Sequence, residues 1–92
     1  MISPTNIEWD KAKAKANELK HGVSFIDAAT SLGDLMSVTI DSTTPDEERF
    51  VNIGMDDNGR LLVVVYTYRG EIGIRIISAR RATPNERRKY GG

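Results

Sequence analysis

Residues 61–68 form an unbroken run of leucine, valine, tyrosine and threonine, and this run constrains the fold more than any other part of the sequence. Successive side chains of a strand point to opposite sides of a sheet, so a strand built from this run is apolar on both faces. A strand of that kind belongs in the middle of a sheet. With 92 residues in all, we expect one domain, spanning residues 1–92, with one small core.

Three further segments are rich in β-branched and aromatic residues and are bounded by turn residues: 35–41, 48–55 and 73–79. The central strand is expected over residues 60–69. The turns on either side of it are short, so the last three strands should form an antiparallel meander. Residues 8–9 are a candidate for a further edge strand.

Residues 9–22 predict a helix whose two ends are marked. Asp10 can cap the first backbone N–H groups, and Gly22 can adopt the left-handed conformation that ends a helix. The apolar positions at helical spacing, which we expect to face the core, are Ala12, Ala16 and Leu19.

A second helix is expected over residues 24–33, with Ser24 and Asp27 as a capping box. Its apolar stripe consists of Phe25, Ala28, Ala29 and Leu32. A third helix is expected over residues 84–90, after the capping sequence Thr83-Pro84-Asn85-Glu86. Together these elements predict an α+β fold in which two N-terminal helices and a C-terminal helix pack on one face of a small antiparallel sheet.

The composition excludes several kinds of site. The chain has no cysteine and one histidine, so a single chain can form no disulfide, no thiolate nucleophile and no multi-histidine metal site. We therefore expect no metal and no other cofactor. No window is long and apolar enough to span a membrane, and the N-terminus does not resemble a signal peptide. We expect a cytoplasmic protein without a membrane partner.

The formal net charge of zero conceals a strong asymmetry. Residues 1–59 carry eleven acidic and five basic residues, whereas residues 60–92 carry two acidic and eight basic residues, seven of them arginine. A guanidinium binds phosphate or carboxylate through two parallel hydrogen bonds, so the second segment favours recognition of one of these groups. Surface pairing between the two segments is the alternative.

Adjacent arginines end the last strand. Strict alternation places Arg75 and Arg81 on one face of that strand and Arg80 on the other. One of the two adjacent arginines should therefore face a site, where a preorganised guanidinium can stabilise the charge that a phosphate gains in a transition state. The other should be structural. An ion pair with an acidic residue of the first two helices is the alternative for each.

Polar residues also gather where other elements end. Tyr66 and Arg69 come where the central apolar run stops, and a half-buried tyrosine with a solvated hydroxyl is the structural alternative there. His21 follows Lys20 in the last turn of the first helix. It can serve as a proton donor, as a base or as a cap for the last helical carbonyl groups, and the sequence leaves these roles open.

Several runs, taken together, resemble the BrnT toxins of bacterial toxin–antitoxin pairs over nearly the whole chain. These runs are Ile7-Glu8-Trp9-Asp10, Lys13-Ala14, Asn17, Lys20-His21-Gly22-Val23-Ser24-Phe25, Ala28, Glu48-Arg49-Phe50, Ile53-Gly54, residues 61–67, Arg69-Gly70, residues 76–83, Glu86-Arg87-Arg88 and Tyr90. The turn at Ile72-Gly73 is one residue longer than the family's usual pattern, and we expect a β-bulge there that re-aims Arg75.

The resemblance implies a fold related to the RelE ribonuclease toxins and an RNA-cleaving activity that stops translation. It also implies neutralisation by a BrnA-like antitoxin, a ribbon-helix-helix protein through which DNA would be contacted only indirectly. A homodimer and a heterotetramer with the antitoxin both stay open. The rival hypothesis is a catalytically silent binding module or a subunit of a heteromeric transcriptional repressor.

The positions that match the family motif supply the candidate site. The implied reaction is metal-independent, with a 2′-hydroxyl attacking the adjacent phosphate, and it needs a base, an acid and cations at the phosphate. We expect Lys20 or His21 as acid or base, and Arg80 and Arg81 on the phosphate. Tyr66 or Tyr90 would orient or stack on the RNA. The further RNA-binding candidates are Arg49, Arg69, Arg87 and Tyr90. We expect Arg87 and Arg88 to attract an acidic, apolar segment of the antitoxin.

Overall fold

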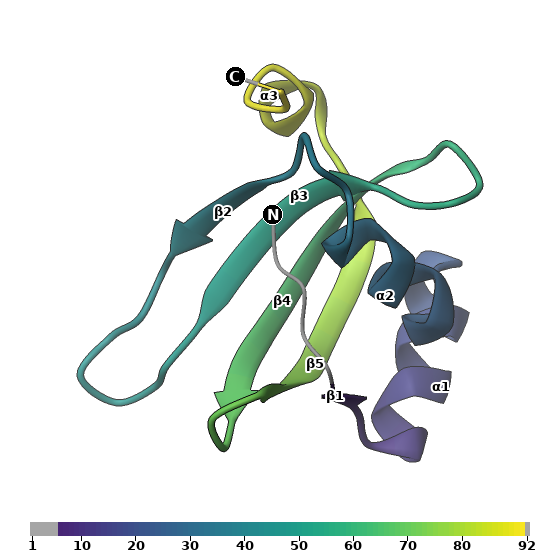
Figure 1. The fold of residues 1–92 in the computed structure, drawn as a ribbon. Coiled ribbons are helices and arrows are strands. Elements are labelled where there is room, and N and C mark those ends of the chain that lie inside the picture. The colour runs from purple at the N-terminus through teal and green to yellow at the C-terminus, as the bar shows by residue number, and fades with distance from the viewer. Residues whose placement is uncertain (1–5, 92) are drawn as a thin grey trace.

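The computed structural model describes residues 6–91. In chain order the elements are β1 (Asn6–Glu8), α1 (Lys11–His21), α2 (Phe25–Leu32), β2 (Val38–Asp41), β3 (Phe50–Met55), β4 (Leu61–Arg69), β5 (Gly73–Arg81) and α3 (Pro84–Arg87). The strands form one five-stranded sheet in the order β1-β5-β4-β3-β2 (Figure 1). The expected α+β class and the interior position of the central strand are therefore confirmed.

The sheet is mixed rather than wholly antiparallel. Strands β2 to β5 pair antiparallel, but β1 runs parallel to β5, with Asn6 opposite Gly73 and Glu8 opposite Arg75. The antiparallel prediction is wrong at this edge because a three-residue strand carries too little pattern to define its partner. Packing of Ile7 against the core selects its place instead.

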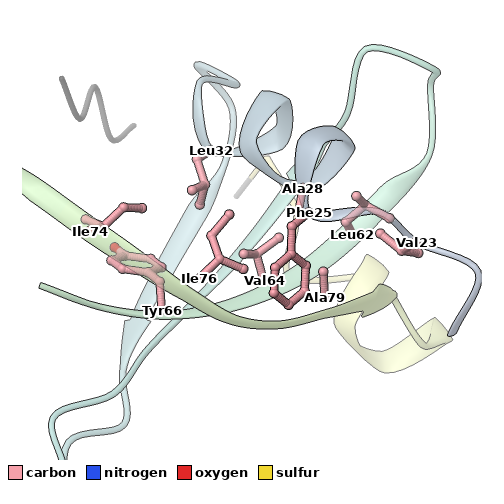
Figure 2. Packing of buried hydrophobic residues seen from close by; sticks show 10 residues of the cluster. All are labelled: Val23, Phe25, Ala28, Leu32, Leu62, Val64, Tyr66, Ile74, Ile76 and Ala79. Carbon is pink, nitrogen blue, oxygen red and sulfur yellow. The ribbon is translucent and has the colours of Figure 1, made fainter. Parts of the chain in front are cut away.

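Helices α1 and α2 lie on one side of the sheet, which we call the helical face (Figure 1). Phe25, Ala28 and Leu32 of α2 pack there against the even-numbered side chains of β4, as Figure 2 shows. The other buried members of this cluster are Val23, Leu62, Val64, Tyr66, Ile74, Ile76 and Ala79. The stripe predicted for the second helix is thus the one that packs on the sheet.

The opposite side of the sheet, which we call the outer face, has a smaller core of its own. Ile53, Leu61 and Val63 are buried there under Ala82 and Tyr90 from the C-terminal segment. The prediction that all three helices share one face is therefore wrong. The capping sequence identifies a helix after β5, but it carries no information on the face to which the chain then turns.

Helix α1 begins and ends where its capping residues indicate. The Asp10 carboxylate accepts a hydrogen bond from the backbone N–H of Lys13, and Gly22 ends the helix with a φ of 70°. Its orientation differs from the prediction, however. The positions predicted to face the core, Ala12, Ala16 and Leu19, are exposed. Ala14 and the buried Asn17 face inward instead, because a polar side chain on this helix finds its hydrogen-bond partners in the sheet.

Two further predictions, the capping box of the second helix and the start of the first long strand, differ from the structure. Ser24 caps α2 through the N–H of Asp27, but the Asp27 carboxylate binds the Arg60 guanidinium at 2.8 Å instead of completing the capping box. Strand β2 begins only at Val38, because the Asp34 carboxylate accepts from the N–H of Met36 and holds a turn before it.

The buried aromatic ring of α2 gives a direct test of this packing. Phe25 is 2% exposed, so Phe25→Ala should lower the free energy of unfolding by about 3–5 kcal/mol, as loss of a large core side chain does. Ile26 is 68% exposed, so Ile26→Ala should cost less than about 1 kcal/mol. Chemical denaturation of both variants measures the difference. Equal losses would contradict the described orientation of α2.

Candidate functional site

A register shift in the β4–β5 pair determines which way the arginines of β5 point. Val65 pairs with Ser78, whereas the next residue of β4, Tyr66, pairs with Ile76. Ile77 therefore has no opposite residue, as in a β-bulge. The bulge lies inside β5, not at the Ile72-Gly73 turn where the sequence predicted one.

The bulge exchanges the faces expected for the arginines. Arg80 pairs with Val63, a residue of the outer face, and Arg81 pairs with Leu62 on the helical face. Arg75 pairs with Thr67 and shares the outer face with Arg80. The prediction that Arg75 and Arg81 share a face is wrong, because one extra residue between them reverses the alternation.

Arg80 is held by the C-terminal segment. Its two terminal nitrogens donate to the two carboxylate oxygens of Glu86, each at 2.7 Å. Glu86 also accepts from the backbone N–H of Thr83, so the capping box of α3 and the ion pair use the same carboxylate. The hydrogen bonds from Arg80 lower the pKa of Glu86 to about 2, against the opposing effect of burial. Arg80 thus fixes α3 to the end of β5.

Asn17 joins α1 to β5. Its Nδ2 donates to the carbonyl oxygens of Ala79 at 2.8 Å and Val23 at 3.0 Å, and its Oδ1 accepts from the N–H of Ala79 at 3.1 Å. The side chain is buried, so loss of these bonds would leave backbone groups unsatisfied. These bonds fix both the rotation of α1 and its position along β5.

The helix and the strand run in the same direction. Asp10, at the start of α1, lies within electrostatic reach of Arg75, whose charge adds to the hydrogen bond from Lys13 in lowering the pKa of Asp10. Further along, Asn17 is bonded to Ala79. The four residues from Asn17 to His21 advance the helix by about 6 Å, and the two residues from Ala79 to Arg81 advance the strand by about 6.6 Å. The C-terminal ends of α1 and β5, which carry His21 and Arg81, therefore lie at the same end of the sheet (Figure 1).

The end of α1 is held from the other side by Arg60. Its Nη1 donates to the carbonyl oxygen of Gly22 at 3.3 Å, while Nη2 binds Asp27 at 2.8 Å and Nε binds the buried Asp56 at 3.0 Å. The β3–β4 turn is thus tied to the junction of α1 and α2. The backbone that carries Lys20 and His21 is therefore constrained by both Asn17 and Arg60.

The cations at this end are available to a ligand. Lys20 and Arg81 are exposed, and His21 is half-buried. Among residues 6–91, none of these three side chains forms a hydrogen bond or an ion pair, whereas the neighbouring Arg60 has two carboxylate partners. Lys20 and His21 end α1 and Arg81 ends β5 on the helical face, whereas Arg80 points to the outer face. We call Lys20, His21 and Arg81 the helical-face cluster.

The two tyrosine candidates are both engaged in packing or hydrogen bonding. Tyr66 is fully buried and stacks on Phe50 with ring centroids 5.6 Å apart. Burial, with a smaller contribution from Tyr68, raises the pKa of Tyr66 to about 12. The Tyr90 hydroxyl donates to the Asp34 carboxylate, and this bond raises its pKa. Neither hydroxyl lies with the helical-face cluster.

The remaining candidate RNA-binding residues are dispersed. The Arg69 Nε lies 3.0 Å from the Glu8 carboxylate on the outer face, and Arg75 lies 3.9 Å from the same oxygen. Arg49 is exposed before β3, and Arg87 is exposed on α3. Within residues 6–91, no three histidine, cysteine, aspartate or glutamate residues come together as a metal-binding group. In the same part of the chain, no helix has the length and apolarity needed to cross a membrane.

Two positioning residues escape a sequence-based search. Asn17 stands among alanines and lysines, and only its position in the resemblance to BrnT toxins singles it out. Asp56 reads as part of a polar turn, yet its side chain is buried beneath Arg60. Both roles depend on partners that are distant along the chain, and the spacing of neighbouring residues does not reveal such partners.

Comparison with known proteins places the chain in a family. Residues 9–86 match the family described as ribonuclease toxin, BrnT, of type II toxin–antitoxin system. The chain belongs to the BrnT family. A crystal structure of the Brucella abortus ribonuclease toxin, BrnT, is similar to it, with a TM-score of 0.68 and 28% identity over 85% of this chain and 96% of that chain. No curated protein sequence matches it. Membership of a BrnT toxin–antitoxin family implies an antitoxin as partner.

The Arg80–Glu86 pair makes the stability of this BrnT-family chain depend on pH. A carboxyl whose pKa is lowered on folding stabilises the fold above its unfolded value, and the contribution is lost as pH falls through the folded value, here about 2. Arg80 is 41% exposed, so we expect Glu86→Gln to cost about 1 kcal/mol at neutral pH after allowance for solvent screening.

Denaturation of the parent and of Glu86→Gln at several pH values measures this contribution. The difference between the two should shrink from pH 5 towards about pH 2. Glu71→Gln is the matched control, because Glu71 is exposed and forms no hydrogen bond or ion pair in residues 6–91. A difference that stays constant with pH would contradict the ionic character of the contact.

Proposed function

We propose that the chain is a metal-independent endoribonuclease toxin that inhibits translation, with its reaction centre at the helical-face cluster. The observation that carries the proposal is the Arg81 guanidinium, which has no hydrogen bond or ion pair among residues 6–91 and is carried by β5 at the end of the sheet where α1 ends with Lys20 and His21. The family description as a ribonuclease toxin supports the reaction class.

The chemistry requires no group outside the chain. The 2′-oxygen of RNA attacks the adjacent phosphorus and the bond to the 5′-oxygen breaks, which leaves a 2′,3′-cyclic phosphate and a 5′-hydroxyl. One of His21 and Lys20 takes the 2′ proton, and the other gives a proton to the leaving 5′-oxygen. Arg81 stabilises the charge on the phosphorane oxygens.

Arg80 has a supporting role in this proposal. Its guanidinium is committed to Glu86, so its contribution is to hold α3 rather than to bind the phosphate. Arg49, Arg69 and Arg87 are exposed and would add electrostatic attraction for the RNA backbone. Tyr66 has no place in the proposed site, since its ring is enclosed in the core.

The partner is proposed from the family. We infer that a BrnA-like ribbon-helix-helix antitoxin neutralises the chain and that the pair contacts DNA through the antitoxin. The rival, a catalytically silent binding module, predicts salt-dependent RNA binding without turnover. Turnover of purified protein therefore separates the two hypotheses.

Arg81→Ala tests the phosphate contact. Removal of a preorganised donor to a transition state costs about 10²–10³ in rate, so cleavage of a defined RNA should fall by that factor. The thermal midpoint should hardly change, because Arg81 is exposed and its side chain is bonded to nothing in residues 6–91. Arg88→Ala removes another exposed arginine, one with no place in the proposed RNA site, so it is the matched control and should retain nearly the parental rate. Parental cleavage by Arg81→Ala would reject this residue as the phosphate contact.

His21→Gln tests the proton transfer. The amide keeps a polar group at the end of α1 but has no proton to exchange near neutral pH, so cleavage should fall by about 10²–10⁴ while RNA affinity changes little. Single-turnover cleavage and a binding titration measure the two effects separately. Equal losses of affinity and rate would mean that His21 binds RNA rather than taking part in the chemistry.

A further inference from the structure

A groove lies between α1 and the N-terminal end of α2. It has a volume of about 210 Å³. Its apolar lining comes from Trp9, Ala14, Phe25 and Ile26, and Lys15 and Glu18 lie along its α1 side. The rings of Trp9 and Phe25 meet edge to face at 6.1 Å, so the aromatic part of the lining is preformed.

Two large aliphatic side chains are exposed on these helices, and one of them, Ile26, lines the groove. Leu19 is 81% exposed and Ile26 is 68% exposed. The exposure of Leu19 follows from the rotation of α1, because the bonds from Asn17 to Ala79 turn the opposite side of that helix outward. Single exposed aliphatic side chains are ordinary. Ile26 in the groove lining and Leu19, which directly follows the lining residue Glu18, together form an apolar surface suited to a partner.

The charge along the groove defines the partner. Helix α1 carries four lysines and one glutamate, and no lysine of α1 forms an ion pair among residues 6–91. Lys11, Lys15 and Leu19 follow one another at four-residue spacing and so share one side of the helix. A complementary segment has carboxylates facing these lysines and apolar side chains facing Leu19 and Ile26.

The groove adjoins the helical-face cluster. Leu19 immediately precedes Lys20 and His21, so a segment seated on Leu19 reaches the end of α1 that carries both. Its carboxylates would also neutralise cations that attract an RNA phosphate. Occupation of the groove and access of RNA to the helical-face cluster are therefore in competition.

We propose that the α1–α2 groove is the docking site for an acidic, amphipathic segment of the protein antitoxin, and that docking there covers Lys20 and His21. The inhibitory half of this proposal depends on the proposed function, whereas the docking half does not. A protein segment fits better than RNA. Leu19 and Ile26 are aliphatic and Phe25 is buried, so among the described residues Trp9 is the one ring of the lining on which a base could stack. Single-stranded RNA, by contrast, stacks successive bases on several aromatic or guanidinium groups. The site differs from the one expected at Arg87 and Arg88.

The test uses full-length protein and the purified antitoxin of the same toxin–antitoxin pair. Leu19→Asp and Ile26→Asp each place a carboxylate where the partner should bring apolar and acidic groups, so the Kd for the antitoxin should rise at least about tenfold. Leu35→Asp is the matched control, since Leu35 is 76% exposed and does not line the groove. Its Kd should stay within about twofold of the parent. Lys15→Glu should weaken binding in a salt-dependent manner.

All of these positions are exposed, so the variants should keep the parental thermal midpoint, and RNA cleavage by the free protein should be unchanged for Leu19→Asp and Ile26→Asp. Parental antitoxin affinity in both variants would overturn the proposal. A loss of antitoxin affinity confined to Leu35→Asp would also overturn it. So would a loss confined to the double variant Arg87→Ala and Arg88→Ala, because that result would place the antitoxin at the C-terminal segment. Loss of RNA binding with intact antitoxin binding would make the groove an RNA surface. If the expected affinity changes occur but even the parent cleaves no RNA, docking stands and the ribonuclease proposal fails.

Discussion

The hydrogen bonds between Asn17 and the backbone of Ala79 determine more of this molecule than any other contact. The buried Asn17 amide satisfies both the N–H and the carbonyl oxygen of Ala79, and it also donates to the carbonyl oxygen of Val23 in the turn after α1. Because the amide must face the sheet, the lysine-rich side of α1 faces solvent and Leu19 is exposed. The same contact brings the end of α1 to the end of β5. The candidate reaction centre and the proposed docking groove are thus two consequences of one helix rotation.

Local chemistry made much of the fold predictable. Asp10 and Gly22 mark the ends of α1, Thr83 and Glu86 form the expected capping box, and the apolar run of β4 belongs in the middle of the sheet. Each of these signals acts within a few residues, so the sequence contains it. Helix rotation, the parallel edge strand and the face covered by the C-terminal segment depend on partners far along the chain. Apolar spacing in α1 even favoured the wrong side, because the buried position is filled by an asparagine.

The sequence singled out candidate residues for the site but did not contain their arrangement. Lys20 and His21 end α1 and Arg81 ends β5, and their membership of a reaction centre stays a prediction. Arg80 was grouped with them because two adjacent arginines look equivalent in a sequence. Its bidentate contact with Glu86 shows that it is bound to α3 instead. Tyr66 was singled out because it comes where the apolar run of β4 stops. The burial of its side chain depends on Phe50, which packs against it from the neighbouring strand β3.

The unpaired residue Ile77 has a consequence for relatives of this chain. A strand without it would regain strict alternation, and the two arginines that follow would exchange sides of the sheet while the letters of the motif stayed the same. An arginine pair in an aligned sequence therefore does not reveal which member meets the ligand. The side of the sheet that each arginine faces depends on the number of residues between the pair and the last residue of the strand that keeps the regular alternation. A gap of one residue inside β5 would thus move both guanidinium groups to the opposite sides of the sheet without a change in either arginine.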